Sequence, residues 1–166
     1  NYNFSYSYGK SSRLFNLLNQ GEVFPFAFDI RHDASLVLAY QISQNVSVSA
    51  LYTFSSGRVL NIQDQMVPIG FTNPLGGAYT QWVTYNQPQN RNSYRLGNVN
   101  RLDWNVTWDK EVSYGRYSIQ LGIYNTTNNI NPYSAIITND ENGNQQIDEI
   151  GLIPLMPNLN LSFAWN

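Results

Sequence analysis

The chain lacks cysteine, carries few charged residues and contains no long apolar run. The absence of cysteine from its 166 residues excludes a disulfide framework and a thiolate metal site. Charged residues make up 12% of the chain, against roughly 25% in soluble domains. No segment approaches the run of about 18 apolar residues that predicts a membrane-spanning helix. A charged, soluble surface and a helical membrane anchor are therefore both disfavoured.

Aromatic and uncharged polar residues take the place of the missing charge. Aromatic residues reach 14%, with 12 Tyr and 4 Trp, yet the mean hydropathy is negative at -0.37. Apolar residues alternate with Asn, Ser, Gln and Thr, and this period of two predicts antiparallel strands. A wall with lipid on one side and a wet lumen on the other has this composition. The net charge of -2 argues against nucleic acid as a partner.

We predict an all-β fold of about six antiparallel transmembrane barrel strands. The predicted strands are Asn1–Lys10, Arg31–Ile42, Val46–Ser56, Ser93–Lys110, Arg116–Thr138 and Gln146–Asn166. The fifth of these is interrupted at Asn131–Tyr133 and then resumes. The Gly57–Asn92 stretch leaves room for a further pair of strands around Leu60–Val67 and Gln81–Tyr85.

The connections between the predicted strands alternate in length. Ser43–Asn45 and Glu111–Gly115 are short, Ser11–Ile30 and Gly57–Asn92 are long, and Asn139–Gln145 is intermediate. Outer-membrane barrels have short periplasmic turns and longer extracellular loops. This rule places the chain in the outer membrane of a Gram-negative cell, with its C-terminus in the periplasm.

Aromatic residues recur at the periplasmic end of the predicted apolar face. They are Tyr2, Tyr40, Trp108, Tyr117 and Trp165. Val46, on the third strand, departs from this pattern. Barrels carry aromatic girdles at both membrane interfaces, so we interpret the five as a membrane girdle. The alternative is the general preference of half-buried strands for aromatic residues.

Six strands are too few to close a membrane barrel, because about eight is the smallest number known. An open sheet edge within a bilayer would leave backbone N–H and C=O groups unpaired, at several kcal/mol each. We therefore expect residues 1–166 to form the C-terminal arc of a larger barrel.

Four segments resemble late barrel strands of TonB-dependent outer-membrane receptors of the Bacteroidetes type. The segments are Phe28–Asp33, Asn90–Leu96 with Asn100–Asp103, Tyr124–Asn125 with Asn131–Tyr133, and Pro154–Pro157. They are similar, in order, to the family's Asp-Arg-x-His motif, its RN-x-YR…RLD and N-x-x-N…NPY motifs, and its closing segment. The last residue, Asn166, departs from the aromatic residue that usually ends such chains.

The resemblance implies a barrel of about 22 strands around a plug domain. It also implies import of a large or scarce nutrient: an iron chelate, vitamin, glycan or peptide. The partners would be the lipid bilayer, the rest of the barrel and its plug, and TonB. We expect the plug domain and the TonB box to lie upstream of Asn1. The chain would then be part of a transporter and not an enzyme.

Two loop regions are candidates for contacts with ligands or partners. Tyr79, Trp82 and Tyr85 lie in the longest loop among glycines and amides, which suits flat or hydroxyl-rich ligands. Packing of the loops against one another is the alternative. The stretch Arg13–Phe28 is too apolar for a bare loop. Folding onto the rim and binding of a surface lipoprotein are two interpretations, and simple packing of the loops is the preferred alternative.

The sequence gives little support for a metal site or a catalytic site. His32 is the only histidine and, without cysteine, predicts a polar rim contact and not a metal site. Asp140–Asp148 resembles a calcium loop, but a hairpin turn explains the same residues. Asp103 and Asp109 could act as paired carboxylates, although a polar network with Arg101 facing the lumen is the preferred interpretation. We predict no cofactor.

Two other classes of protein remain as alternatives. One is a barrel or scaffold subunit of a larger envelope assembly that does not transport. The other is a soluble β-sandwich that binds carbohydrate. The core of a sandwich would not concentrate aromatic residues at matching heights on strand after strand, which favours the membrane interpretation.

Overall fold

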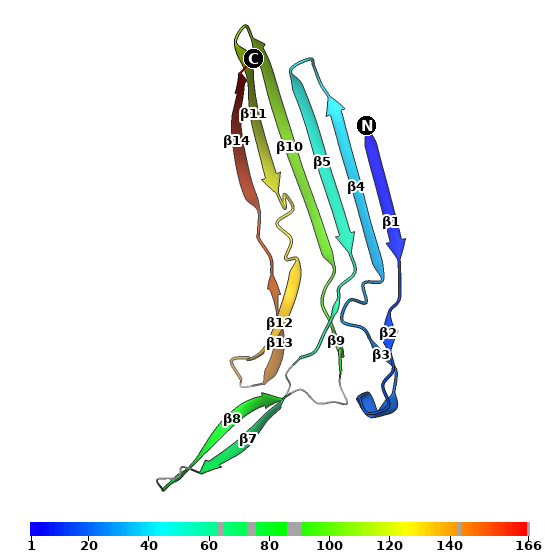
Figure 1. Cartoon of the computed structure of the whole chain (residues 1–166), viewed down its shortest axis with the longest axis vertical. Coiled ribbons are helices and arrows are strands. Elements are labelled where there is room, and N and C mark those ends of the chain that lie inside the picture. The colour runs from blue at the N-terminus through cyan, green and yellow to red at the C-terminus, as the bar shows by residue number, and fades with distance from the viewer. Residues whose placement is uncertain (63–64, 73–75, 86–90, 143, 166) are drawn as a thin grey trace.

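The computed structural model describes residues 1–62, 65–72, 76–85, 91–142 and 144–165. Its main feature is an antiparallel sheet in the order β1-β4-β5-β10-β11-β14 (Figure 1). These strands are β1 (Tyr2–Tyr8), β4 (His32–Gln41), β5 (Val46–Ser55), β10 (Val99–Val112), β11 (Gly115–Tyr124) and β14 (Met156–Trp165). The prediction of an all-β antiparallel fold is confirmed.

Four short ladders extend the chain beyond one end of this sheet. They pair β2 (Ser12–Arg13) with β3 (Phe24–Pro25), β6 (Val59–Leu60) with β9 (Tyr94–Arg95), β7 (Gln65–Thr72) with β8 (Ala78–Tyr85), and β12 (Pro132–Asn139) with β13 (Gln145–Gly151). A single 3-10 turn, η1 (Asn19–Gly21), lies between β2 and β3. Among the described residues, no helix is long and apolar enough to cross a membrane.

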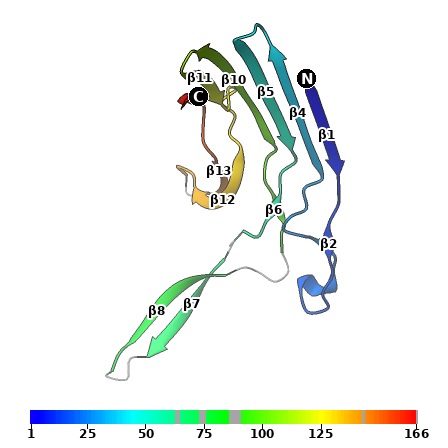
Figure 2. The same ribbon diagram turned by 45° about the horizontal axis from the view of Figure 1, so that its top comes forward.

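The connections divide the sheet into two ends. The tight β4–β5 and β10–β11 turns lie at the end where both chain termini lie, which we call the turn end (Figure 1). The four short ladders lie at the opposite end, which we call the loop end. The β7–β8 hairpin projects from the loop end, away from the sheet (Figures 1 and 2).

Two details of the predicted strands are wrong. The fifth strand does not continue in the main sheet past Asn131–Tyr133, because Asn125 takes a left-handed conformation (φ 51) and the strand that begins at Pro132, β12, pairs with β13. The predicted sixth strand is two strands, β13 and β14, in different sheets. The further pair for which the Gly57–Asn92 stretch left room is present as β7 and β8, and among the described strands these two pair with each other.

The main sheet is a curved arc with two open edges (Figure 2). In the part of the chain that the structure describes, β1 pairs only with β4 and β14 pairs only with β11. Four of the six strands have 10 residues: β4, β5, β11 and β14. That matches the length of about 9–11 residues with which a tilted strand crosses a bilayer.

Candidate functional site

The two faces of the main sheet differ sharply in chemistry. Residues that lie opposite each other in an antiparallel ladder share a face. One face carries an unbroken apolar band: Phe4, Leu36, Leu38, Tyr52, Leu102, Trp104, Val106, Leu121, Ile123, Leu159 and Leu161. We call this the apolar face. Within the described residues no second sheet packs on it, and many of its side chains are exposed.

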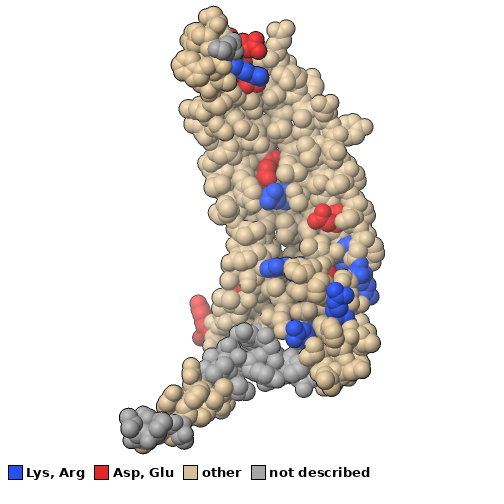
Figure 3. Space-filling view, in the orientation of Figure 1, with Lys and Arg blue, Asp and Glu red and all other residues tan. Residues whose placement is uncertain are grey.

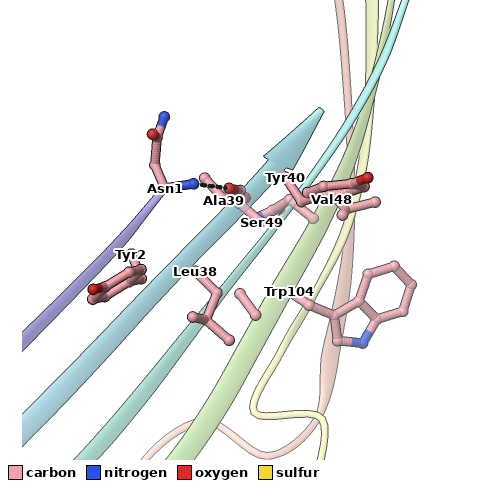
Figure 4. A pocket seen from close by; sticks show the side chains of 10 residues that line it. Asn1, Tyr2, Leu38, Ala39, Tyr40, Val48, Ser49 and Trp104 are labelled. Carbon is pink, nitrogen blue, oxygen red and sulfur yellow. Dashed lines mark hydrogen bonds between the residues drawn. The ribbon is translucent and has the colours of Figure 1, made fainter. Parts of the chain in front are cut away.

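A hollow of about 490 Å³ interrupts the apolar face toward the turn end (Figure 4). Ala50 lies in one row between Leu38 and Trp104, and its short side chain leaves the space open. Tyr2 and Tyr40 also line the hollow, and no charged side chain does. The hollow is part of the apolar face and presents no catalytic group.

The five aromatic residues of the predicted girdle are shifted along the strands, in one direction, from each strand that carries one to the next. Carried across the ladders to β10, Tyr2, Tyr40, Trp108, Tyr117 and Trp165 fall in the rows of Trp104, Val106, Trp108, Lys110 and Val112. The total shift is eight residues over five strand-to-strand steps. Strands tilted by about 35–45° and ~4.8 Å apart should shift by roughly 1 to 1.5 residues per step. The stagger suits a tilted wall, and the girdle stays a prediction.

The opposite face, which we call the polar face, is lined mainly by hydroxyls and amides. Its rows include Ser5, Ser35, Ser47, Ser49, Asn105, Thr107, Ser118, Gln120, Asn158, Asn160 and Ser162. The Ser5 and Ser35 hydroxyls, for example, lie 2.8 Å apart across the β1–β4 ladder. Acidic and basic side chains are sparse over the middle of the sheet and gather toward its two ends (Figure 3).

The predicted carboxylate pair is not a pair in the structure. Asp103 and Asp109 share the polar face of β10 but contact different arginines. Arg101 Nε lies 3.0 Å from Asp103 Oδ2, and Arg116 donates to Asp109 Oδ2 at 2.9 Å. The two carboxylates are therefore separate ion pairs, an arrangement that suits a polar wall and offers no joint acid–base site.

A buried ion pair ties together the connections at the loop end. The carboxylate of Asp29 is 1% exposed and accepts hydrogen bonds from the Ser11 amide and from Arg95. Arg95 also donates to the carbonyl oxygens of Asp29 and Gly57, at 2.8 and 2.6 Å. Arg31 Nε lies 3.5 Å from the same carboxylate. One guanidinium therefore joins the segment before β4, the segment after β5 and strand β9.

The pKa of Asp29 is lowered from its usual value. Burial by itself raises this pKa, but the Ser11 amide, the Arg95 guanidinium and the charge of Arg31 together outweigh burial. A carboxyl with a lowered pKa stabilises the fold above its unfolded pKa of about 3.9, and this contribution disappears as the pH falls through the folded value. We call the Asp29–Arg95 contact the loop latch.

The loop latch is expected to open in acid. Hydrogen exchange of peptides covering residues 11–31, corrected for the intrinsic effect of pH, should accelerate as the pH drops below about 4. The Asp29→Asn variant should exchange quickly at neutral pH and lose this dependence. Glu22→Gln, which removes an exposed acid from the same segment, is the control and should behave like the wild type. Retention of the acid response in Asp29→Asn would assign that response to another group.

Two buried asparagines hold the connection between β11 and β12. The backbone amide of Asn125 donates to Asp103 Oδ1 at 2.9 Å, and its side-chain amide donates to the carbonyls of Asn129 and Ile153. Asn131 Oδ1 accepts from the Asn100 amide at 2.7 Å. The chain leaves the main sheet here, and these bonds satisfy the polar groups that would otherwise be unpaired.

A third set of contacts joins β13 to β9 and to the segment between β9 and β10. Glu149 Oε1 accepts from the Tyr94 hydroxyl at 3.0 Å and from the Gly97 amide at 2.8 Å. Burial and the neighbouring Glu149 carboxylate raise the pKa of Tyr94, so its hydroxyl stays protonated and donates. Asn92 contributes a further link, because its side chain donates to the Pro25 carbonyl at 2.8 Å.

The candidate ligand contacts Tyr79, Trp82 and Tyr85 all lie on β8, in the projecting hairpin. In the register Tyr79 faces Phe71, Trp82 faces Pro68 and Tyr85 faces Gln65. Positions three apart on a strand belong to opposite faces, so the backbone separates Tyr79 from Trp82. Tyr79 stacks on Phe71 with ring centroids 5.3 Å apart. The side chains of Trp82 and Tyr85 lie outside the described residues.

His32 and Asp140 contact other protein groups in the structure. His32 Nδ1 lies 2.9 Å from the Tyr6 hydroxyl, and its ring contacts Tyr8. Asp140 accepts from the Asn142 and Asn144 amides, which is the pattern of a turn. Throughout the described ranges, no three His, Cys, Asp or Glu residues gather in a group that could hold a metal ion.

The buried polar residues all come from motifs noted in the sequence, although their role was not predicted. Asp29, Asn92, Asn125 and Asn131 are the buried polar residues of the described chain, and each lies in one of the segments that carry the family resemblance. The motifs therefore coincide with the hydrogen bonds that organise the loop end. Comparison with models of known protein families, with curated proteins and with solved structures found no match to this chain.

Proposed function

We propose that this chain forms an arc of the wall of a TonB-dependent outer-membrane transporter. The observation that carries the proposal is one uncovered apolar face backed, across six strands, by a polar face of mainly hydroxyls and amides with ion pairs at Asp103 and Asp109. Apolar area of this extent is rarely left exposed to water and marks a surface that binds lipid or protein. Lipid on one face and a wet lumen on the other account for both faces together.

The apolar face suits lipid better than it suits a second protein layer. In a β-sandwich an apolar face packs against another sheet about 10 Å away. The described strands beyond the main sheet form two-stranded ladders at the loop end, and none of them covers this face (Figures 1 and 2). The strand lengths and the stagger of the aromatic rows are those of a tilted transmembrane wall.

The assignment to a transporter rests on the family resemblance of four segments. Their residues supply the buried contacts at the loop end, which would lie outside the cell. In such a transporter the polar face would meet the lumen and the plug, and the loop end would meet the substrate. TonB would act on a part of the protein other than this chain.

Membrane insertion is tested by fractionation of cells that express the whole gene product to which residues 1–166 are proposed to belong. We expect it in the outer-membrane fraction and expect detergent to be needed to extract it. A chain that stays monodisperse in buffer without detergent would contradict a membrane wall and would favour the sandwich.

Transport is tested separately, by the gene sequence that precedes Asn1. A region that encodes a plug-like domain and a TonB box is expected there. A gene without them would favour the scaffold, because energy coupling would then have no structural basis.

A further inference from the structure

We infer that the segment Lys10–Arg31 anchors the loop end in the facing lipid leaflet, with apolar side chains in the membrane interface and cations on lipid phosphates. The inference rests on the proposed membrane location of the sheet. It goes beyond that proposal because this segment lies outside the six-stranded wall.

The first observation is an exposed apolar cluster on this segment. Its members are Leu14, Phe15, Leu17, Val23, Phe28 and Ile30. Leu17 is 95% exposed. Simple loop packing was the preferred prediction for Arg13–Phe28, yet only Phe24 of the large apolar residues in this segment is buried. Loop packing therefore accounts for part of the segment and leaves these other side chains exposed.

The conformation of the segment is held from its buried side. Phe15 and Phe24 are in ring contact at 6.2 Å, the loop latch fixes Asp29, and Asn92 binds the Pro25 carbonyl. Backbone bonds from Phe26 to Ser11 and from Gly9 to Arg31 close the base. Because these contacts fix the backbone, the exposed side chains cannot turn inward without breaking them.

The second observation is the charge that flanks the cluster. Lys10 and Arg13 are exposed, and Arg13 lies over the Phe26 ring at 4.3 Å. Arg31 is also exposed, but its Nε lies 3.5 Å from the Asp29 carboxylate. The acids of the segment are Glu22, which is exposed, and Asp29, which is buried against Arg95. The exposed charge is therefore mostly positive. Apolar side chains flanked by cations are typical of segments that lie in the interface of anionic lipid.

The third observation is continuity with the apolar face. β2 follows β1 directly at the edge of the sheet (Figure 1). Tyr6 and Tyr8 are on the apolar face of β1, at its loop end, beside His32. Aromatic residues of this kind sit at the level of lipid headgroups, so the next residues along the chain reach the interface.

The absence of cysteine makes the inference directly testable by spin labelling. A nitroxide would be attached to the Leu17→Cys variant of the whole gene product that contains this chain, with any cysteine outside residues 1–166 replaced by serine. The labelled protein would be placed in vesicles of phosphatidylcholine with phosphatidylglycerol. Its collision rates with oxygen, which enriches in lipid, and with a water-soluble nickel chelate report depth. We expect the oxygen-to-nickel ratio to be several-fold higher than for Ile147→Cys, which labels an exposed apolar position beside Asp148 and Glu149.

A third label separates failure of this inference from failure of the proposed function. Leu121→Cys labels the middle of the apolar face. Lipid exposure at Leu121 with water exposure at Leu17 overturns the anchor alone, and water exposure at both overturns the wall as well. An immobile Leu17 label reached by neither reagent indicates a protein partner, which also overturns the anchor.

A separate experiment tests the role of Lys10 and Arg13. In the Leu17→Cys background, Lys10→Gln combined with Arg13→Gln should move the label toward water in vesicles that contain phosphatidylglycerol. The label should then have the depth seen in phosphatidylcholine alone, where the substitutions should have little effect. Equal effects in both vesicles would show that lipid phosphates are not recognised.

Discussion

Replacing Trp104 by lysine is expected to destabilise the chain in a bilayer by about 2–4 kcal/mol, the cost of a lysine near the midplane of a barrel wall. Trp104 lies in the middle of the apolar band of β10, between Leu102 and Val106, and in the row of Ala50 and Ile123. Urea unfolding of the whole gene product that contains this chain, measured in lipid vesicles, gives the free energy of unfolding. Heat modification on gels reports whether the chain assembles at all.

Two variants separate the effect of charge from the loss of the indole. Trp104→Leu removes the ring but keeps an apolar side chain, so it should cost less than the lysine. Ser49→Lys places the same charge on the polar face, directly opposite Asn105 in the β5–β10 ladder. It should be tolerated, because that face meets water in the proposed wall. If Ser49→Lys is as destabilising as Trp104→Lys, the two faces have been assigned wrongly.

Replacing Gly57 by alanine is expected to cost about 3 kcal/mol, the upper range for adding a group to a tightly packed site. A Cβ at this position would lie 1.6 Å from the Leu96 carbonyl oxygen and 2.5 Å from its carbon. Both are backbone atoms, so the chain segments after β5 and before β10 would have to separate. That movement would break the bonds of Arg95 to Gly57 and Asp29, and with them the loop latch.

Gly9→Ala is the matched control for this variant. Nothing lies within 4 Å of a Cβ at Gly9, although it too follows a strand of the main sheet. Gly9→Ala should leave stability unchanged and leave the hydrogen exchange of residues 11–31 slow. Gly57→Ala should lower stability and speed that exchange. A Gly57→Ala variant with normal exchange would mean that the two segments separate without opening the latch.

The strands of the main sheet could be predicted because their signal is local. Leu102, Trp104 and Val106 alternate with Asp103, Asn105 and Thr107, and a period of two is a property of neighbouring residues. Short connections then force antiparallel neighbours, as in β4–β5 and β10–β11. The register followed from these turns, and it gave the two faces their chemistry.

The errors fall where local pattern and tertiary contacts disagree. Pro132–Asn139 has strand-forming residues, but the left-handed turn at Asn125 redirects the chain and β13 becomes its partner. The sequence left room for the β7–β8 pair, but it did not predict that these strands lie in a ladder separate from the main sheet. The pairing of strands depends on contacts between residues far apart in sequence, and local composition does not predict such contacts.

The sequence by itself determined the strands, the two chemically distinct faces and the end at which the tight turns lie, because period and connection length are local. Only the tertiary structure showed that Asp29 and Arg95, 66 residues apart, share one ion pair. It likewise showed that Asn100 meets Asn131 and that Tyr94 meets Glu149. Such contacts satisfy polar groups that burial makes costly, and burial exists only after distant segments have come together.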